Sequence, residues 1–321
     1  MKPVLLIKSG WDVLKTVPFA YAPYKNDIRI ALRGDSLTLD SESGKYLKRL
    51  DYEKIPDEFV GFLGLKVADI MNGNYKLASD EKIKMGKNSV LLLNFSGVAD
   101  DIIDGKVQDK DKKKKFIRYL FDIAFNGTVA PDLEKIKDMD YRGTFAHARA
   151  VYSVFQGKSK VISGVYENLM NAVFKQFEIT NLEGALINSE KVGALSLEVL
   201  VNLNQEITGN TDSLKKQAIM HWGSYAQLLD DLVDTDEDLI QGNNTFPALF
   251  LKQNKNTKSS RREIKRIIRQ RGIEHIKEGI SLLDSKKSRE TFQEIRELID
   301  LKYSLYEFAI KATRKLSRKK K

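Results

Sequence analysis

The sequence predicts a single all-α domain built as a bundle of long helices. Only six prolines occur in 321 residues, and proline is the residue that breaks a helix most strongly. Apolar residues recur at spacings of three and four from about residue 52 onward, which is the period of a helix with one buried face. No linker, low-complexity segment or internal repeat divides the chain, and this length can bury one large core.

The composition excludes several function classes. Hydrophobic residues make up 42% and charged residues 31% of the chain, values that are typical of a folded globular protein. The chain has no cysteine, so disulfides, thiolate nucleophiles and zinc–thiolate sites are excluded. Its three histidines, His147, His221 and His275, are scattered, which argues against a nucleophilic triad or zinc hydrolysis.

The first 50 residues are the least regular part of the chain, and we expect segment 1–50 to pack on the bundle. Their apolar start is broken by Lys8 and lacks a small-residue cleavage pattern, so it does not resemble a secretory signal. No apolar run approaches the roughly 18 to 20 residues of a membrane span. The sequence therefore predicts a soluble, cytoplasmic protein.

Helical periodicity fills the predicted domain, residues 51–316. Glycine and asparagine separate its helices, for example at Gly209-Asn210 and at 242–244. The expected helices are 57–73, 87–104, 111–127, 132–138, 142–155, 159–178, 188–207, 211–235, 244–254, 259–284 and 287–316.

Basic residues give the chain a formal net charge of +10 and cluster at 110–115, at 261–271 and in the basic tail 317–321. Such runs are usually solvated faces or ends, although either of the first two could face a phosphate or another anion. No aromatic residues are interleaved with them as they are on RNA-binding surfaces, so nucleic acid is not predicted as a partner. The tail is a candidate for peripheral contact with an anionic membrane.

An acidic cluster follows an apolar run in the stretch VADDIIDGKV, residues 98–107. A helix N-terminus would explain Asp100 alone, because the apolar run already begins at Val90. Within a helix, Asp100 and Asp104 lie on one face and repel each other. Together with Asp101 they need a compensating partner.

A second acidic cluster lies about 130 residues later, in the stretch QLLDDLVDTDED. Asp230, Asp234 and Asp238 are spaced by four, so they stack on one helix face. They occupy the C-terminal half of their helix, where the helix dipole disfavours negative charge. Two clusters of the same design make a solvated surface a poor explanation.

Divalent metal binding accounts for both clusters. Mg²⁺ prefers oxygen ligands and usually binds through a few carboxylates while it keeps substrate phosphate oxygens in its shell. Two carboxylate faces around one cavity could hold two or three Mg²⁺ ions on a diphosphate. The ions would improve diphosphate as a leaving group, and aromatic side chains such as Phe95, Phe125 and Tyr225 could stabilise a carbocation.

These residues resemble the class I isoprenoid synthases, which include terpene synthases, trans-prenyl diphosphate synthases and squalene and phytoene synthases. ADDIIDG is similar to their first aspartate-rich motif, and GSYAQLLDDLVDTDED is similar to the second, including Gln227 before it. EKVGALS resembles a Lys-Thr-Gly segment with Val192 in place of threonine. GNNTFPALFL resembles the stretch after the second motif.

The resemblance implies a helical bundle around a central apolar cavity and a magnesium-dependent enzyme. It ionises a prenyl diphosphate, and the cation cyclises or eliminates a proton, as in a terpene synthase, a carbon–oxygen lyase. The alternative is a prenyltransferase that joins two isoprenoid units, head-to-head or by chain elongation. Elongating synthases carry Gly-Gly-Lys and Arg-Pro segments for their second diphosphate, and this sequence has neither. A non-catalytic protein that binds metal or a basic partner, and a homodimer, are left open.

The resemblance also assigns roles to individual residues. Asp100, Asp104, Asp230 and Asp234 are the expected catalytic residues. Lys191 and Gln227 are the expected diphosphate contacts, and Arg142 and Arg149, seven residues apart on one helix face, are further candidates to clamp the diphosphate. The expected metal ligands are Asp100, Asp101, Asp104, Asp230, Asp231, Asp234 and Asp238.

Overall fold

The computed structural model describes residues 57–73, 76–106, 109–155 and 160–297, although the side chains of 57–62, 98–106 and 139–140 lie outside this description. The predicted N-terminal segment 1–50 and the tail 317–321 lie outside the described residues. Within these ranges every regular element is helical, which confirms the predicted all-α class. No helix of the described part is long and apolar enough to cross a membrane.

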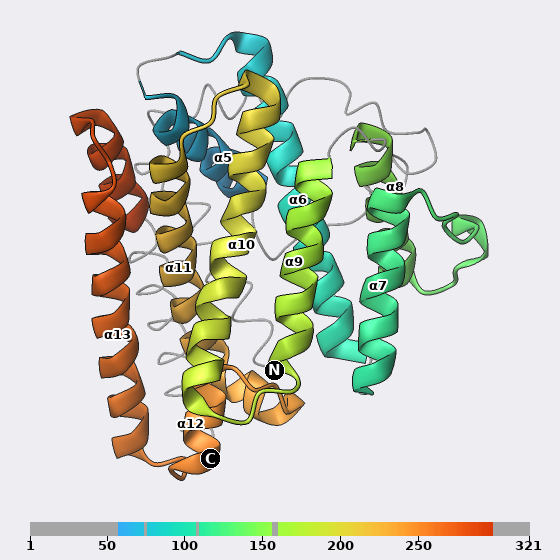
Figure 1. Ribbon diagram of the computed structural model, residues 1–321. Coiled ribbons are helices and arrows are strands. Elements are labelled where there is room, and N and C mark those ends of the chain that lie inside the picture. Colours follow the sequence, from blue (N-terminus) through green and yellow to red (C-terminus); the bar gives the residue numbers. More distant parts are fainter. Residues whose placement is uncertain (1–56, 74–75, 107–108, 156–159, 298–321) are drawn as a thin grey trace, which may run out of the picture.

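The long helices stand side by side in one bundle, with α13 at one edge and α7 and α8 at the other (Figure 1). α10 is the central helix, because it packs against α5, α6, α9, α11 and α12. α11 lies between α10 and α13, and α6 packs on α5, α8 and α10. The elements are α5 (Asp57–Asn72), α6 (Ser79–Lys106), α7 (Lys110–Asn126), the 3-10 turn η1 (Leu133–Lys135), α8 (Met139–Phe155), α9 (Lys160–Gln176), α10 (Leu182–Thr208), α11 (Ser213–Gln241), α12 (Phe246–Gln253), α13 (Lys258–Ser281) and a helical segment at 286–297.

Side-chain caps and glycines fix the ends of the two central helices. Asn181 accepts a hydrogen bond from the backbone N–H of Gly184 at the start of α10, and Asp212 does the same for the first turn of α11. Such caps satisfy N–H groups that have no partner inside the helix. Gly209 and Gly242 end the helices at φ 72° and φ 80°, a left-handed conformation that glycine adopts without strain.

Several predicted boundaries are wrong where polar residues open or close a helix. α6 begins at Ser79 instead of 87, and α10 begins at Leu182 instead of 188. The first turn of α6 is stabilised by the Glu81 carboxylate, which accepts from the backbone N–H of Ala78 at 2.7 Å, and apolar periodicity does not detect such a turn. The predicted helix at 132–138 is only the short turn η1.

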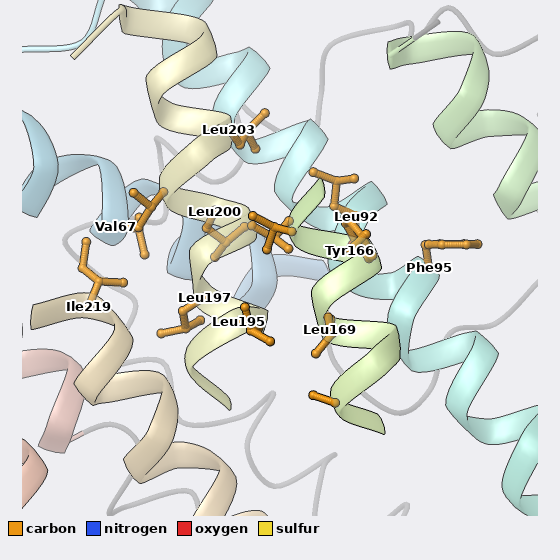
Figure 2. Packing of buried hydrophobic residues seen from close by; sticks show 14 of the residues in the cluster. Val67, Leu92, Phe95, Tyr166, Leu169, Leu195, Leu197, Leu200, Leu203 and Ile219 are labelled. Atoms are coloured by element: carbon orange, nitrogen blue, oxygen red, sulfur yellow. The ribbon is translucent and has the colours of Figure 1, made fainter. Parts of the chain in front are cut away.

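The core is organised around α10, which is buried on several sides. Figure 2 shows side chains of α5, α6, α9 and α11 meeting those of α10. A fully buried leucine of this kind stabilises a fold by about 1.5–3 kcal/mol. The labelled core residues are Val67, Leu92, Phe95, Tyr166, Leu169, Leu195, Leu197, Leu200, Leu203 and Ile219.

α10 and α11 come into backbone contact where two glycines meet. A Cβ atom added to Gly193 would lie 2.2 Å from the Gly223 carbonyl oxygen, and one added to Gly223 would lie 2.2 Å from the Gly193 oxygen. Beside this crossing, the Ser224 hydroxyl donates to the Glu190 carbonyl oxygen at 2.9 Å. No larger residue fits at either position without moving a helix.

A glycine also permits the close packing of α13 on α11. A Cβ atom on Gly272 would lie 2.5 Å from ring carbons of Tyr225. A Cβ atom on Gly279 would lie 3.2 Å from the Ala218 carbonyl oxygen. Side chains on the facing surfaces of α11 and α13 are therefore brought within hydrogen-bonding reach.

The glycine crossing predicts a large and position-specific loss of stability. Gly193→Ala should lower the free energy of unfolding by about 1–3 kcal/mol, because the new methyl group meets backbone. Gly164→Ala is the matched control, since no described atom lies within 4 Å of its added Cβ, and alanine there should stabilise α9 by up to about 1 kcal/mol. Urea unfolding followed by circular dichroism measures both. Equal stabilities of the two variants would contradict the crossing.

Candidate active site

The second acidic cluster lies in the last turns of α11. Asp230, Asp231, Asp234 and Asp238 all precede the end of this helix at Gln241. Asp231 and Asp238 are buried, and Asp230 and Asp234 are half-buried. Four carboxylates are thus held together at the negative end of a helix dipole, where each raises the cost of ionising the others.

Burial and mutual repulsion perturb the acidity of this cluster. Burial raises the pKa of Asp231 to about 7. Burial, together with the negative charges of Asp230 and Asp238, raises the pKa of Asp234 to about 8. Burial also raises the pKa of Asp238, against the opposing effect of its hydrogen bonds. A bound cation would oppose these shifts, because its positive charge favours the ionised carboxylates.

One buried carboxylate oxygen of the cluster lacks a hydrogen bond. Gln227 Nε2 donates to Asp231 Oδ1 at 2.9 Å. Asp231 Oδ2 is buried and makes no hydrogen bond of normal geometry among the described residues, while the nearby Ser189 side chain acts to lower the pKa of this carboxyl. An orphaned buried oxygen of this kind is costly, and it is the donor atom that a hard cation such as Mg²⁺ prefers. The residues therefore fit the metal that the sequence predicts.

Asp238 also stabilises the turn between α11 and α12 by accepting hydrogen bonds from it. Asn243 Nδ2 donates to Asp238 Oδ1 at 3.1 Å, and the Thr245 hydroxyl donates to Oδ2 at 2.6 Å. The backbone N–H of Gly242 also donates to the Asp238 carbonyl oxygen. An ionised carboxylate has about four acceptor positions, so these bonds leave capacity for a metal ligand.

Two lysines lie near the acidic cluster: Lys252, which the sequence did not single out, and Lys110, which belongs to the basic run 110–115 that the sequence did single out. Lys252 Nζ donates to the Asn243 carbonyl oxygen and to Asn244 Oδ1, both at 3.0 Å. Burial and then the charge of Lys110 lower the pKa of Lys252, while Asp238 opposes this. Lys110 Nζ donates to the Phe177 carbonyl oxygen at 3.1 Å. Both ammonium groups are placed where an anion next to the cluster could be bound.

The position of Lys110 links the second acidic cluster to the first. Lys110 begins α7, four residues after α6 ends at Lys106. In Figure 1 the C-terminal end of α6, the start of α7 and the turn between α11 and α12 lie at the same end of the bundle. Asp100, Asp101 and Asp104 lie in the last turns of α6, but their side chains are outside the described residues. The backbone places Asp100 and Asp104 one helical turn apart.

The other predicted diphosphate contacts are distributed differently. Lys191 is exposed on α10, whereas its neighbour Glu190 is buried. Arg142 donates from Nε to the Ile136 carbonyl oxygen at 2.7 Å, so its guanidinium is engaged in the loop before α8. Arg149 is half-buried on α8, which packs on α6 and α7. Their diphosphate roles stay predictions.

A groove of about 630 Å³ runs along α13, with a lining that includes Arg262, Arg266, Arg269 and Lys277. Its basic lining differs from the central apolar cavity that the sequence predicts. The central cavity stays a prediction.

Comparisons with known proteins give only distant similarity. No family model matches the chain, and no curated protein matches it. It is similar to the crystal structure of a geranyltranstransferase from Methanosarcina mazei, with a TM-score of 0.48 and 12% identity over 91% of this chain and 97% of that one. It is also similar to a decaprenyl diphosphate synthase from Rhodobacter capsulatus, with a TM-score of 0.40 and 14% identity over 96% of this chain and 92% of that one. Similarity at this level assigns no activity to the chain.

The raised acidities predict an unusual pH dependence of stability. In the folded state the pKa values of Asp231 and Asp234 are about 7 and about 8, against 3.8 for a free aspartate side chain. Between pH 3.8 and these raised values, the two residues therefore bind more protons in the folded state than in the unfolded state. Without divalent cations, stability should therefore fall as pH rises from about 5 to about 8. Thermal unfolding in a chelator across this range measures the effect.

Two controls accompany this measurement. Excess Mg²⁺ should raise the melting temperature at pH 8 and flatten the pH dependence. Asp231→Asn should reduce the slope in chelator, because one of the titrating groups is gone. A melting temperature that is constant or rises with pH in chelator would contradict the assignment.

Proposed function

We propose that this protein is a magnesium-dependent enzyme of the class I isoprenoid synthase type, which ionises a prenyl diphosphate. The observation that carries the proposal is the buried carboxylate cluster at the end of α11, with the orphaned Asp231 Oδ2. Buried carboxylates without compensating cations are costly. A cation that binds together with an anionic substrate would compensate this free-energy cost during function.

Each group of residues has a task in this proposal. The carboxylates of α11, together with those of Asp100, Asp101 and Asp104 on α6, would hold Mg²⁺. Bound there, the ion supplies charge neutralisation of the departing diphosphate. Lys110 and Lys252 would bind diphosphate oxygens as the carbon–oxygen bond breaks, and the bonding electron pair leaves with the diphosphate. What remains is an allylic carbocation.

An aromatic cluster lies next to the first acidic motif and would shield the cation from water. Phe95 is on α6, five residues before Asp100, and its ring lies 6.3 Å from that of Phe125 and 6.1 Å from that of Tyr166. The Phe125 and Tyr166 rings are 4.9 Å apart. The Tyr166 hydroxyl donates to the Leu92 carbonyl oxygen at 2.6 Å, which holds the cluster in place. π faces of this kind stabilise a nearby positive charge.

For the fate of the cation, we propose transfer to a second isoprenoid unit, the alternative that the sequence leaves open. Gln227 supports it, since this residue precedes the second motif in the trans-prenyl diphosphate synthases that the segment resembles, and it donates directly to Asp231. Cyclisation or elimination remains the second candidate, because the N-terminal signature for the homoallylic diphosphate is missing.

Removal of one charge from each cluster should abolish most of the activity. Asp100→Asn and Asp234→Asn should each lower turnover at least about 100-fold, a loss of about 2.7 kcal/mol of transition-state stabilisation. Release of diphosphate from farnesyl diphosphate with Mg²⁺, measured with and without isopentenyl diphosphate, is the assay. Glu237→Gln is the charge control: it removes one of the negative charges that act on Asp234 from an exposed residue of the same helix that is not an expected ligand, and this variant should retain nearly full activity. Full activity of Asp100→Asn and Asp234→Asn would refute the proposal.

The product distinguishes transfer from cyclisation. Geranyl, farnesyl and geranylgeranyl diphosphates should each be offered with Mg²⁺, with and without isopentenyl diphosphate. A longer prenyl diphosphate, detected by mass only when isopentenyl diphosphate is present, is the expected result. A hydrocarbon or alcohol formed without isopentenyl diphosphate would instead establish cyclisation or elimination. A hydrocarbon of doubled carbon number would establish head-to-head coupling.

A further inference from the structure

Two of the three histidines meet across the interface of α11 and α13. His221 on α11 and His275 on α13 face each other, with their Nδ1 atoms 3.0 Å apart. Glu278, one helical turn after His275, places Oε2 3.3 Å from His221 Nδ1. One ligand atom from each of the three side chains lies within 4.8 Å of the others. Two imidazole nitrogens and a carboxylate oxygen thus converge on one point.

Two of the three separations match those of neighbouring ligands around a transition-metal ion, and the third, between His275 and Glu278, is at most 4.8 Å. Zn²⁺ binds imidazole nitrogen and carboxylate oxygen at about 2.0–2.2 Å, so two ligand atoms in tetrahedral geometry are about 3.3 Å apart. The distances of 3.0 Å and 3.3 Å found here need only a small adjustment. The two rings would approach in this way without a metal only if one imidazole N–H donates to the other.

The surroundings of His275 resemble the outer shell of a metal site. His275 Nε2 is buried and lies 3.1 Å from Glu190 Oε1, although the pair is not well aligned for a hydrogen bond. Arg271 holds Glu190 from the other side, with Nε 2.5 Å from Oε1 and a second guanidinium nitrogen 3.2 Å from Oε2. A metal-binding histidine commonly offers its second nitrogen to a carboxylate, which fixes the ring and its tautomer.

Glu190 and Arg271 form an ion pair behind the ring of His275. Nε2 of His275 therefore lies beside a carboxylate oxygen, while its Nδ1 faces Nδ1 of His221. Without a metal, one of the two facing nitrogens donates to the other. A metal ion would replace that proton and bind a lone pair of each ring, because histidine binds a metal through an unprotonated nitrogen.

We propose that His221, His275 and Glu278 bind a divalent transition-metal ion, with Zn²⁺ as the best match, and that the ion clamps α13 to α11. Two imidazoles and one carboxylate suit zinc better than magnesium. His221 precedes Asp230 by nine residues, about 14 Å along the helix axis, so this site is separate from the acidic cluster. The proposal does not depend on the proposed enzymatic activity.

The ion has a route to the site from solvent. The side chain of Glu278 is 56% exposed and that of His221 is 28% exposed, whereas that of His275 is only 6% exposed. The carboxylate therefore forms the outer ligand, and the buried imidazole is fixed from behind by Glu190. Three protein ligands leave one position for water or another small ligand.

Zinc binding to the full-length protein tests the proposal. The chain should first be stripped with a chelator and then titrated with Zn²⁺ by calorimetry in excess Mg²⁺, which keeps the acidic cluster occupied. We expect one equivalent of Zn²⁺ and a rise in the melting temperature, because an ion that binds only the folded state stabilises it. Co²⁺ in place of Zn²⁺ should give a visible absorption spectrum typical of nitrogen and oxygen ligands.

Variants at the ligands separate this site from adventitious binding. His221→Gln and Glu278→Gln should each weaken Zn²⁺ binding by at least about tenfold, since even the loss of an outer-shell partner costs about 10–100-fold. Glu278 is exposed, so its variant should fold normally. Glu263→Gln, an exposed position on the same helix, is the matched control and should bind as the unaltered protein does. No stoichiometric Zn²⁺ binding, or equal binding by all variants, would leave only a hydrogen bond between the histidines and overturn the proposal.

Discussion

The backbone contact between Gly193 and Gly223 is the constraint on which both sites depend. It brings α10 and α11 so close that no side chain fits between them, and it fixes which face of α11 is buried. Gln227 lies one turn further along α11, against Gly193, and directs its amide to Asp231. Glu190, one turn earlier on α10, is carried toward α13 and reaches His275 and Arg271. This one helix crossing therefore positions residues of both charged clusters.

Buried carboxylates at two positions along α11 lie in opposite electrostatic environments. Near the middle of α11 lies Glu190 of the neighbouring helix α10. Arg271 balances the charge of Glu190, and the pKa of Glu190 is lowered to about 2. At the C-terminal end of α11, burial and repulsion raise the pKa of Asp234 to about 8. The same chemical group is compensated at one position and uncompensated at the other. Because an uncompensated buried charge is costly, the carboxyls at the second position favour the protonated form, and a cation bound beside them would favour the ionised form.

Local features of the sequence predict the fold well and the contacts of the sites poorly. Helical periodicity and the glycines at 209 and 242 define most of α10 and α11, and the spacing by four places Asp230, Asp234 and Asp238 on one face. Spacing cannot reveal that Arg142 is engaged by the Ile136 carbonyl, because that bond depends on the path of a loop. Nor can it join His221 to His275, which are 54 residues apart and meet only through the packing of two helices. Scattered histidines in a sequence are therefore no argument against a metal site.

Asp238 connects the charge of the acidic cluster to the structure around it. Its carboxylate accepts hydrogen bonds from Asn243 and Thr245, and these bonds are stronger when the acceptor is ionised. Burial, and to a smaller extent repulsion from Asp230 and Glu237, favours its neutral form, which would weaken the same bonds. A cation in the cluster would shift Asp238 toward the ionised form and so tighten the turn that leads into α12 and to Lys252. Asp238 would thus couple metal binding to the α11–α12 turn and to Lys252 beside it.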